Sequence, residues 1–111
     1  MEKIILLKSN LFADGDQKLQ ETLMGSFLRK LWASPKKPDA IIFYGTAVKL
    51  LAKGSSVLDA LTGLEEEGVE LLGCGTCLGY YEVEGDLMAG RKTSMSEVIE
   101  LMMNAKSVIT P

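Results

Sequence analysis

The residues of this chain best suited to covalent chemistry are its two cysteines, which form one short motif, Cys74-Gly75-Thr76-Cys77. A thiol becomes nucleophilic when its thiolate form is stabilised, and the backbone N–H groups at the start of a helix do this without a separate base. Gly75 lets such N–H groups approach the sulfur closely, and Thr76 adds a small hydroxyl group. The motif therefore predicts reactive thiols at Cys74 and Cys77.

Three other interpretations of the cysteine pair have a physical basis. Zinc prefers four Cys or His ligands. One copy of the chain offers two thiols and no histidine, so only a four-thiolate site shared between copies would satisfy the metal. A structural disulfide is disfavoured in a reducing cytosol, whereas inert packing is common for cysteine. Reactive thiols remain the preferred interpretation, and we predict neither a metal site nor a cofactor.

Composition excludes several classes of function. The absence of histidine removes Cys–His and Ser–His catalysis. With 12 Lys and Arg against 15 Asp and Glu, the net charge of −3 gives no electrostatic basis for binding nucleic acid. The longest apolar runs, 4–7 and 40–44, are far shorter than the roughly 20 residues of a membrane span. The first residues carry no apolar stretch of the kind found in a secretory signal, so we expect a cytoplasmic protein that does not contact membranes.

Hydrophobic patterning predicts an alternation of strands and helices. Apolar segments predict strands over 3–8, 40–44, 69–73 and 107–109, and the segment 90–93 fits a brief fourth strand between the last two. Apolar residues at helical spacing, with start and stop signals, predict helices over 17–34, 46–53, 56–68 and 74–81, and a last helix that begins at Ser94 and includes Val98, Leu101 and Met102. In the first helix, the predicted buried stripe runs through Leu19, Leu23, Phe27 and Leu31 and is widened by Met24 and Leu28.

Polar residues mark where three of these helices begin. Asp14 or Asp16 is placed to cap the first helix. The pairs Ser56 with Asp59 and Ser94 with Glu97 have the three-residue spacing of a capping box.

This order of elements predicts a single α/β domain over residues 1–111, with a parallel sheet of about five strands and helices on both faces. In such sheets, ligands and chemistry gather beyond the carboxyl ends of the strands. Those ends include the predicted thiols Cys74 and Cys77. They also supply the candidate binding residues Ser9, Asn10, Gly45, Gly75 and Thr76.

Several segments together resemble a known family. The chain is similar to the DsrE-like sulfur-relay superfamily, and most of all to the C-terminal domain of YedF-type proteins, which are described as selenium metabolism proteins. The most specific segment is Cys74-Gly75-Thr76-Cys77-Leu78 followed by Tyr80-Tyr81. The segments 41–44, 64–69 and 105–111 are also similar. The resemblance implies a five-stranded parallel sheet, assembly into oligomers, and a relay cysteine just after the third strand, which corresponds to Cys74.

The resulting hypothesis is a small cytoplasmic carrier of persulfide sulfur or selenium, similar to a sulfurtransferase. Cys74 would take the terminal sulfur from a donor, and Cys77 would resolve the adduct or share the load. The partner would be a sulfur donor or acceptor protein, with a TusA-like protein as one candidate. Two alternatives stay open: a thiol–disulfide redox or sensing module, and a non-catalytic subunit that binds a small ligand or supports assembly.

Position and charge favour different sulfurs within the motif. The strand-end position and the resemblance favour Cys74, whereas the first turn of a helix would lower the pKa of Cys77 more directly. Because carriage requires access to a partner thiol, Cys74 is the preferred acting residue. We also expect a homo-oligomer, since so short a chain has few ways to cover Trp32, Tyr80, Tyr81 and Met88.

Overall fold

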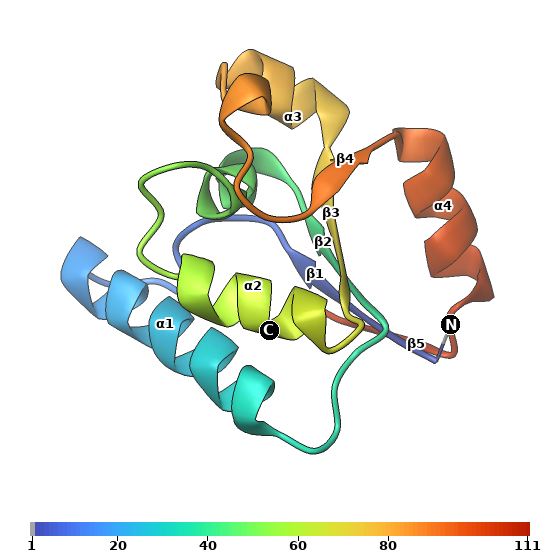
Figure 1. Ribbon diagram of the computed structural model, residues 1–111, viewed down its shortest axis with the longest axis horizontal. Coiled ribbons are helices and arrows are strands. Elements are labelled where there is room, and N and C mark those ends of the chain that lie inside the picture. Colours follow the sequence, from blue (N-terminus) through green and yellow to red (C-terminus); the bar gives the residue numbers. More distant parts are fainter. Residues whose placement is uncertain (1) are drawn as a thin grey trace.

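The computed structural model describes residues 2–111, which form a five-stranded, wholly parallel sheet covered by helices (Figure 1). The strands lie side by side in the order β4-β3-β2-β1-β5. Their bounds are β1 Lys3–Leu7, β2 Ala40–Phe43, β3 Glu70–Cys74, β4 Arg91–Thr93 and β5 Ser107–Ile109. The helices are α1 Gln17–Ala33, α2 Leu58–Glu66, α3 Gly75–Tyr80 and α4 Met95–Asn104, with the 3₁₀ helices η1 Gly45–Leu51 and η2 Glu84–Asp86. The predicted fold class is confirmed.

The central strands are buried on both faces, as their continuous apolar runs predict. Alternate residues of β1 point to opposite sides of the sheet. Ile5 belongs to one core with α1, α2, η1 and α3, whereas Ile4 belongs to a second core with α4. The helices therefore divide unequally, and α4 stands apart from α1 and α2 across the sheet (Figure 1).

Helix α1 begins where the sequence predicts, but it buries a different stripe. The Asp16 carboxylate accepts a hydrogen bond from the Leu19 N–H at 2.8 Å and caps the helix. The deepest residues are Met24 and Leu28, whereas Leu19 is 48% exposed. The expectation that Leu19 and Leu23 lead the buried face is wrong, because α1 turns the row through Gln20, Met24 and Leu28 toward the sheet.

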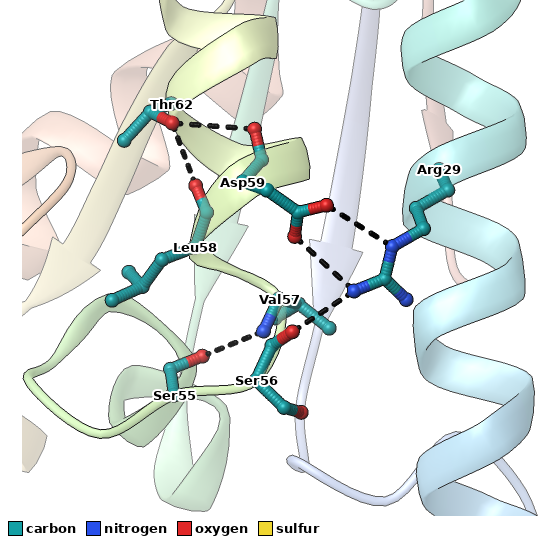
Figure 2. Close-up of polar contacts among 7 residues, drawn as sticks. All are labelled: Arg29, Ser55, Ser56, Val57, Leu58, Asp59 and Thr62. Carbon is teal, nitrogen blue, oxygen red and sulfur yellow. Dashed lines mark hydrogen bonds and ion pairs between the residues drawn. The ribbon is translucent and has the colours of Figure 1, made fainter.

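The predicted capping box at the start of α2 does not form. Neither Ser56 nor Asp59 caps the helix, whose N-cap is Val57 without a side-chain bond. Asp59 is instead held by Arg29 of α1, whose Nε and terminal nitrogen lie 3.2 and 3.1 Å from the two carboxylate oxygens (Figure 2). Arg29 also donates to the backbone carbonyl of Ser56 at 2.9 Å. A contact between helices has replaced the local cap.

The connections between strands create a crevice at one end of the sheet. The chain leaves β3 through α3, whose Leu78 packs in the same core as α1 and α2. It leaves the neighbouring β4 through α4, whose Val98 packs on the opposite face. Adjacent connections therefore part between the carboxyl ends of β3 and β4. This is the topological switch point at which open parallel sheets bind ligands.

None of the helices within residues 2–111 has both the length and the apolar character needed to cross a membrane.

Candidate functional site

Cys74 lies at the switch point because it is the last residue of β3. It pairs in register with Thr93 of β4, and only 5% of Cys74 is exposed. A pocket of about 390 Å³ opens beside it. The pocket is lined by Cys74, Gly75, Thr76, Lys92, Thr93, Ser94 and Met95. Cys74 is thus reached from a crevice and not from the general surface.

Cys77 lies in the first turn of α3 and faces the residue that follows β2. Its Sγ accepts a hydrogen bond from the Gly45 N–H at 3.2 Å. Gly45 has a left-handed φ of +53°, and a Cβ at this position would stand 2.9 Å from the Lys8 carbonyl oxygen. Glycine therefore permits the tight turn that aims this N–H at the sulfur.

Burial governs the charge state of Cys77. It raises the pKa of the Cys77 thiol, and the neighbouring Cys74 adds to the increase. The Gly45 N–H opposes this effect and does not reverse it. The expectation that the start of α3 lowers the pKa of Cys77 is therefore wrong, and Cys77 is a protonated thiol at neutral pH.

Tyr44 is a neighbour of the two cysteines that the sequence did not single out. Its phenol is half-buried and donates to the Met95 Sδ at 3.5 Å, which links the end of β2 to the start of α4. Burial raises the pKa of Tyr44, and the negative charge of either thiolate raises it further. The phenol therefore keeps its proton beside the sulfurs. The sequence could have indicated Tyr44 as a site residue, because it ends the predicted strand 40–44 and directly precedes Gly45.

Glu97 of α4 forms hydrogen bonds that fix the position of Thr93, one of the residues that line the pocket. Its carboxylate accepts from both terminal nitrogens of Arg91, at 3.0 and 2.8 Å, and from the Thr93 hydroxyl. The hydrogen bonds from Arg91 and then from Thr93 lower the pKa of Glu97 to about 2. The Ser94 hydroxyl accepts from the Glu97 N–H at 3.1 Å, so the predicted cap of this last helix is confirmed. β4 and α4 are thereby joined around Thr93.

The predicted binding residues separate into two groups. Gly75 and Thr76 line the pocket with Cys74, and Gly45 contacts Cys77. Ser9 and Asn10 lie instead in a neighbouring polar network. The Thr46 hydroxyl lies 3.3 Å from the Ser9 hydroxyl, and its oxygen accepts from the Asn10 N–H at 3.1 Å. Lys92 and Met95 also line the pocket, although the sequence analysis did not propose them as binding residues. Their position at the end of the fourth predicted strand could have indicated it.

Both cysteines are free thiols. Within residues 2–111, no three Cys, Asp or Glu side chains converge as metal ligands would. The pocket therefore presents the free thiol of Cys74, and the Cys77 thiol and the Tyr44 phenol lie close to it.

Solved structures with the same architecture span the whole chain. The ychN protein from E. coli superposes with a TM-score of 0.74 at 17% identity, and all of both chains is covered. MTH1491 from Methanobacterium thermoautotrophicum, described as a protein of unknown function, gives 0.70 at 18% identity, again over both full chains. BT1422 from Bacteroides thetaiotaomicron, a conserved protein of unknown function, gives 0.66 at 15% identity over 99% of this chain and 95% of its own. These likenesses show the fold.

Comparison with curated proteins gave no match. The model of the DsrE/DsrF-like family matches residues 11–111, which include every strand after β1 and the whole cysteine motif. The chain therefore belongs to the DsrE/DsrF-like family.

Proposed function

We propose that this protein carries sulfane sulfur as a persulfide on Cys74 and passes it between partner thiols. The observation that carries the proposal is the position of Cys74, which ends β3 and lines the pocket at the switch point. Membership of the DsrE/DsrF-like family, which is associated with sulfur relay, supports the same chemistry.

The transfer needs no oxidant. The Cys74 thiolate attacks the terminal sulfur of a donor persulfide, R–S–SH, and forms a new S–S bond while the donor S–S bond breaks. The donor leaves as the thiolate R–S⁻, and Cys74 holds –S–SH. Attack by an acceptor thiolate on that terminal sulfur completes the relay and restores Cys74.

Cys77 has a supporting role in this scheme. Desolvation and the neighbouring Cys74 raise the pKa of the Cys77 thiol, so Cys77 is not the attacking thiolate in this scheme. As a nearby thiol it can resolve a loaded or mixed-disulfide Cys74 once it loses its proton.

The finer resemblance suggests the cargo and the partner. A YedF-like role would extend the cargo to selenium, since a thiolate accepts selenium in the same position as sulfane sulfur. The partner would be a donor or acceptor protein of the TusA-like kind, and the relay would operate in the cytoplasm.

We also propose that the protein acts as a homo-oligomer. On the outer side of α4, Met95, Ile99 and Met103 are 52, 55 and 80% exposed, and Val108 of β5, on the same face of the sheet, is 37% exposed. α4 covers its face of the sheet without the second helix that the opposite face has. A second copy would cover this surface.

Mass spectrometry of the intact protein after treatment with a persulfide donor tests the relay. We expect a gain of about 32 Da per sulfur on Cys74, retained in Cys77→Ser and lost in Cys74→Ser. Loss of about 2 Da would indicate the disulfide of a redox module. No change in mass would indicate a binding subunit, and loading on Cys77 alone would contradict the assignment of Cys74.

A further inference from the structure

The pocket beside Cys74 contains a positive charge that the proposed transfer does not use. Lys92 is the one charged residue among those that line the pocket in the described part of the chain. Its Cε lies 2.9 Å from the point where a Cβ of residue 75 would stand, so its stem lies against Gly75. Lys92 therefore extends along the backbone that directly follows Cys74, in a protein whose net charge is −3.

The charge of Lys92 is engaged by a partner that can be displaced. Its Nζ lies 2.9 Å from the Glu84 Oε1 at the start of η2. The side chains of Lys92 and Glu84 are 57 and 49% exposed, and ion pairs so open to water are weak. An anion that enters the pocket can therefore take the place of Glu84. The ionised Glu97 in the first turn of α4 is already paired with Arg91, so Lys92 is the charge on the pocket lining that a ligand can engage.

The proposed transfer creates a need for such a charge. The attacking Cys74 thiolate is an anion, and a thiosulfate donor is a dianion whose outer sulfur bonds to Cys74 while its S–S bond breaks and sulfite leaves with the electron pair. Two negative charges repel one another as they approach, and a cation beside both of them offsets the repulsion.

We propose that Lys92 is the specificity-determining residue of this pocket and selects small anionic sulfur donors over neutral ones, with Glu84 as the counter-ion that the donor displaces. The inference rests on the proposed function for the identity of the donor. Lys92 acts here through its charge and does not exchange sulfur itself.

Alkylation with a charged and a neutral reagent of similar size tests the selection. The Cys74 thiolate displaces iodide from either iodoacetate or iodoacetamide, so that an S–C bond forms, the C–I bond breaks and iodide leaves with the electron pair. The ratio of the two rate constants at Cys74, measured by peptide mapping, reports the electrostatic potential at the sulfur. Iodoacetamide alone shows whether Cys74 is reactive.

We expect Lys92→Met, which keeps the apolar stem, to lower the iodoacetate to iodoacetamide ratio about threefold to tenfold at low salt. Lys92→Arg should retain the ratio, and Glu84→Gln should raise it by freeing Lys92. Salt should reduce the difference between the wild type and Lys92→Met. The matched control is Lys106→Met, since Lys106 forms a similar exposed pair with Glu2 but does not line the pocket. An unchanged ratio in Lys92→Met, or an equal fall in Lys106→Met, would overturn the inference.

A second measurement does not depend on a reactive thiol. In an NMR titration with thiosulfate, the amide signals of Gly75, Thr76 and Thr93 should shift in the wild type and in Glu84→Gln but not in Lys92→Met. Absence of these shifts in the wild type overturns the inference even where Cys74 is alkylated. Shifts without any persulfide loading of Cys74 would support anion selection and contradict the relay.

Discussion

The two sulfurs of one four-residue motif occupy different environments, and the roles proposed for them follow from this difference. Cys74 ends a strand and lines a pocket, whereas the Cys77 sulfur is turned toward Gly45 at 3.2 Å. Three residues separate them in the chain, and Cys74, the more buried of the two, is the one that lines the pocket. Access to the pocket, and not the start of the helix, therefore favours Cys74 as the acting residue.

The raised pKa of Cys77 predicts its reactivity as a function of pH. The folded protein is alkylated with iodoacetamide at a series of pH values, and peptide mapping gives the rate at Cys77. The pH at which this rate is half its maximum should lie above the ordinary thiol pKa of 9.0. The reason is that burial disfavours the thiolate more than the Gly45 N–H stabilises it. A midpoint below that value would show that the hydrogen bond outweighs burial.

The lowered pKa of Glu97 predicts a loss of stability in acid. The folded state favours the ionised carboxylate, so this contribution is complete above about pH 4.5 and is lost as the pH falls toward 2. Glu97→Gln should flatten the curve of unfolding free energy against pH in this window. Glu100→Gln, on the same helix, is the control, and an equal flattening there would contradict the prediction.

Helix starts in this protein use either a local cap or a contact between elements. The Asp16 carboxylate bonds to the N–H of Leu19 three residues ahead, so the signal is contained in the sequence. At α2 the acidic residue Asp59 is instead bound by Arg29, which lies 30 residues away. Figure 2 shows the guanidinium of Arg29 bridging α1 to the first turn of α2.

The two helix starts should respond differently to removal of their polar side chains. Asp16→Ala should lower the unfolding free energy by about 1 kcal/mol, as expected for loss of an N-cap. Ser56→Ala should change it by less than about 0.5 kcal/mol, because the contact with Arg29 uses the backbone carbonyl of Ser56. Urea denaturation measures both. If Ser56→Ala lowered the unfolding free energy as much as Asp16→Ala does, the predicted capping box at Ser56 would be supported.

In the molecule as a whole, the crossover from β4 at one edge of the sheet to β5 at the other determines where the pocket lies and which helix has an exposed apolar side. It takes α4 to the opposite face, and this opens the pocket between β3 and β4. It also leaves α4 as the helix that covers that face, with its outer apolar residues exposed. The site and the proposed oligomer contact thus follow from one connection.

Light scattering at micromolar concentration tests the oligomer. We expect a mass that is a multiple of the 12.1 kDa chain. Replacing Ile99 and Met103 of α4 with lysine should lower that mass, because buried charge opposes association. Leu19→Lys is the control, since Leu19 is similarly exposed on α1 across the sheet. A monomer of 12.1 kDa in the wild type would refute the proposal.

Local patterns in the sequence are enough to predict the order of the main strands and helices. Unbroken apolar runs such as Ala40–Phe43 indicated strands buried on both faces, and the caps at Asp16 and Ser94 marked two helix starts. The sequence also placed Cys74 at a strand end. These features depend on residues close together in the chain, where periodicity and hydrogen-bond spacing act directly.

The tertiary structure decided which strand end carries a pocket and which residues share it. The sequence proposed Ser9 and Asn10 on equal terms with Gly75 and Thr76, because the order of strands in the sheet is not visible in local patterns. Lys92 meets Gly75 only because β4 lies beside β3. The pKa of Cys77 likewise depends on the burial that η1 and β2 provide. Contacts between distant segments are set by packing, and packing is a property of the whole chain.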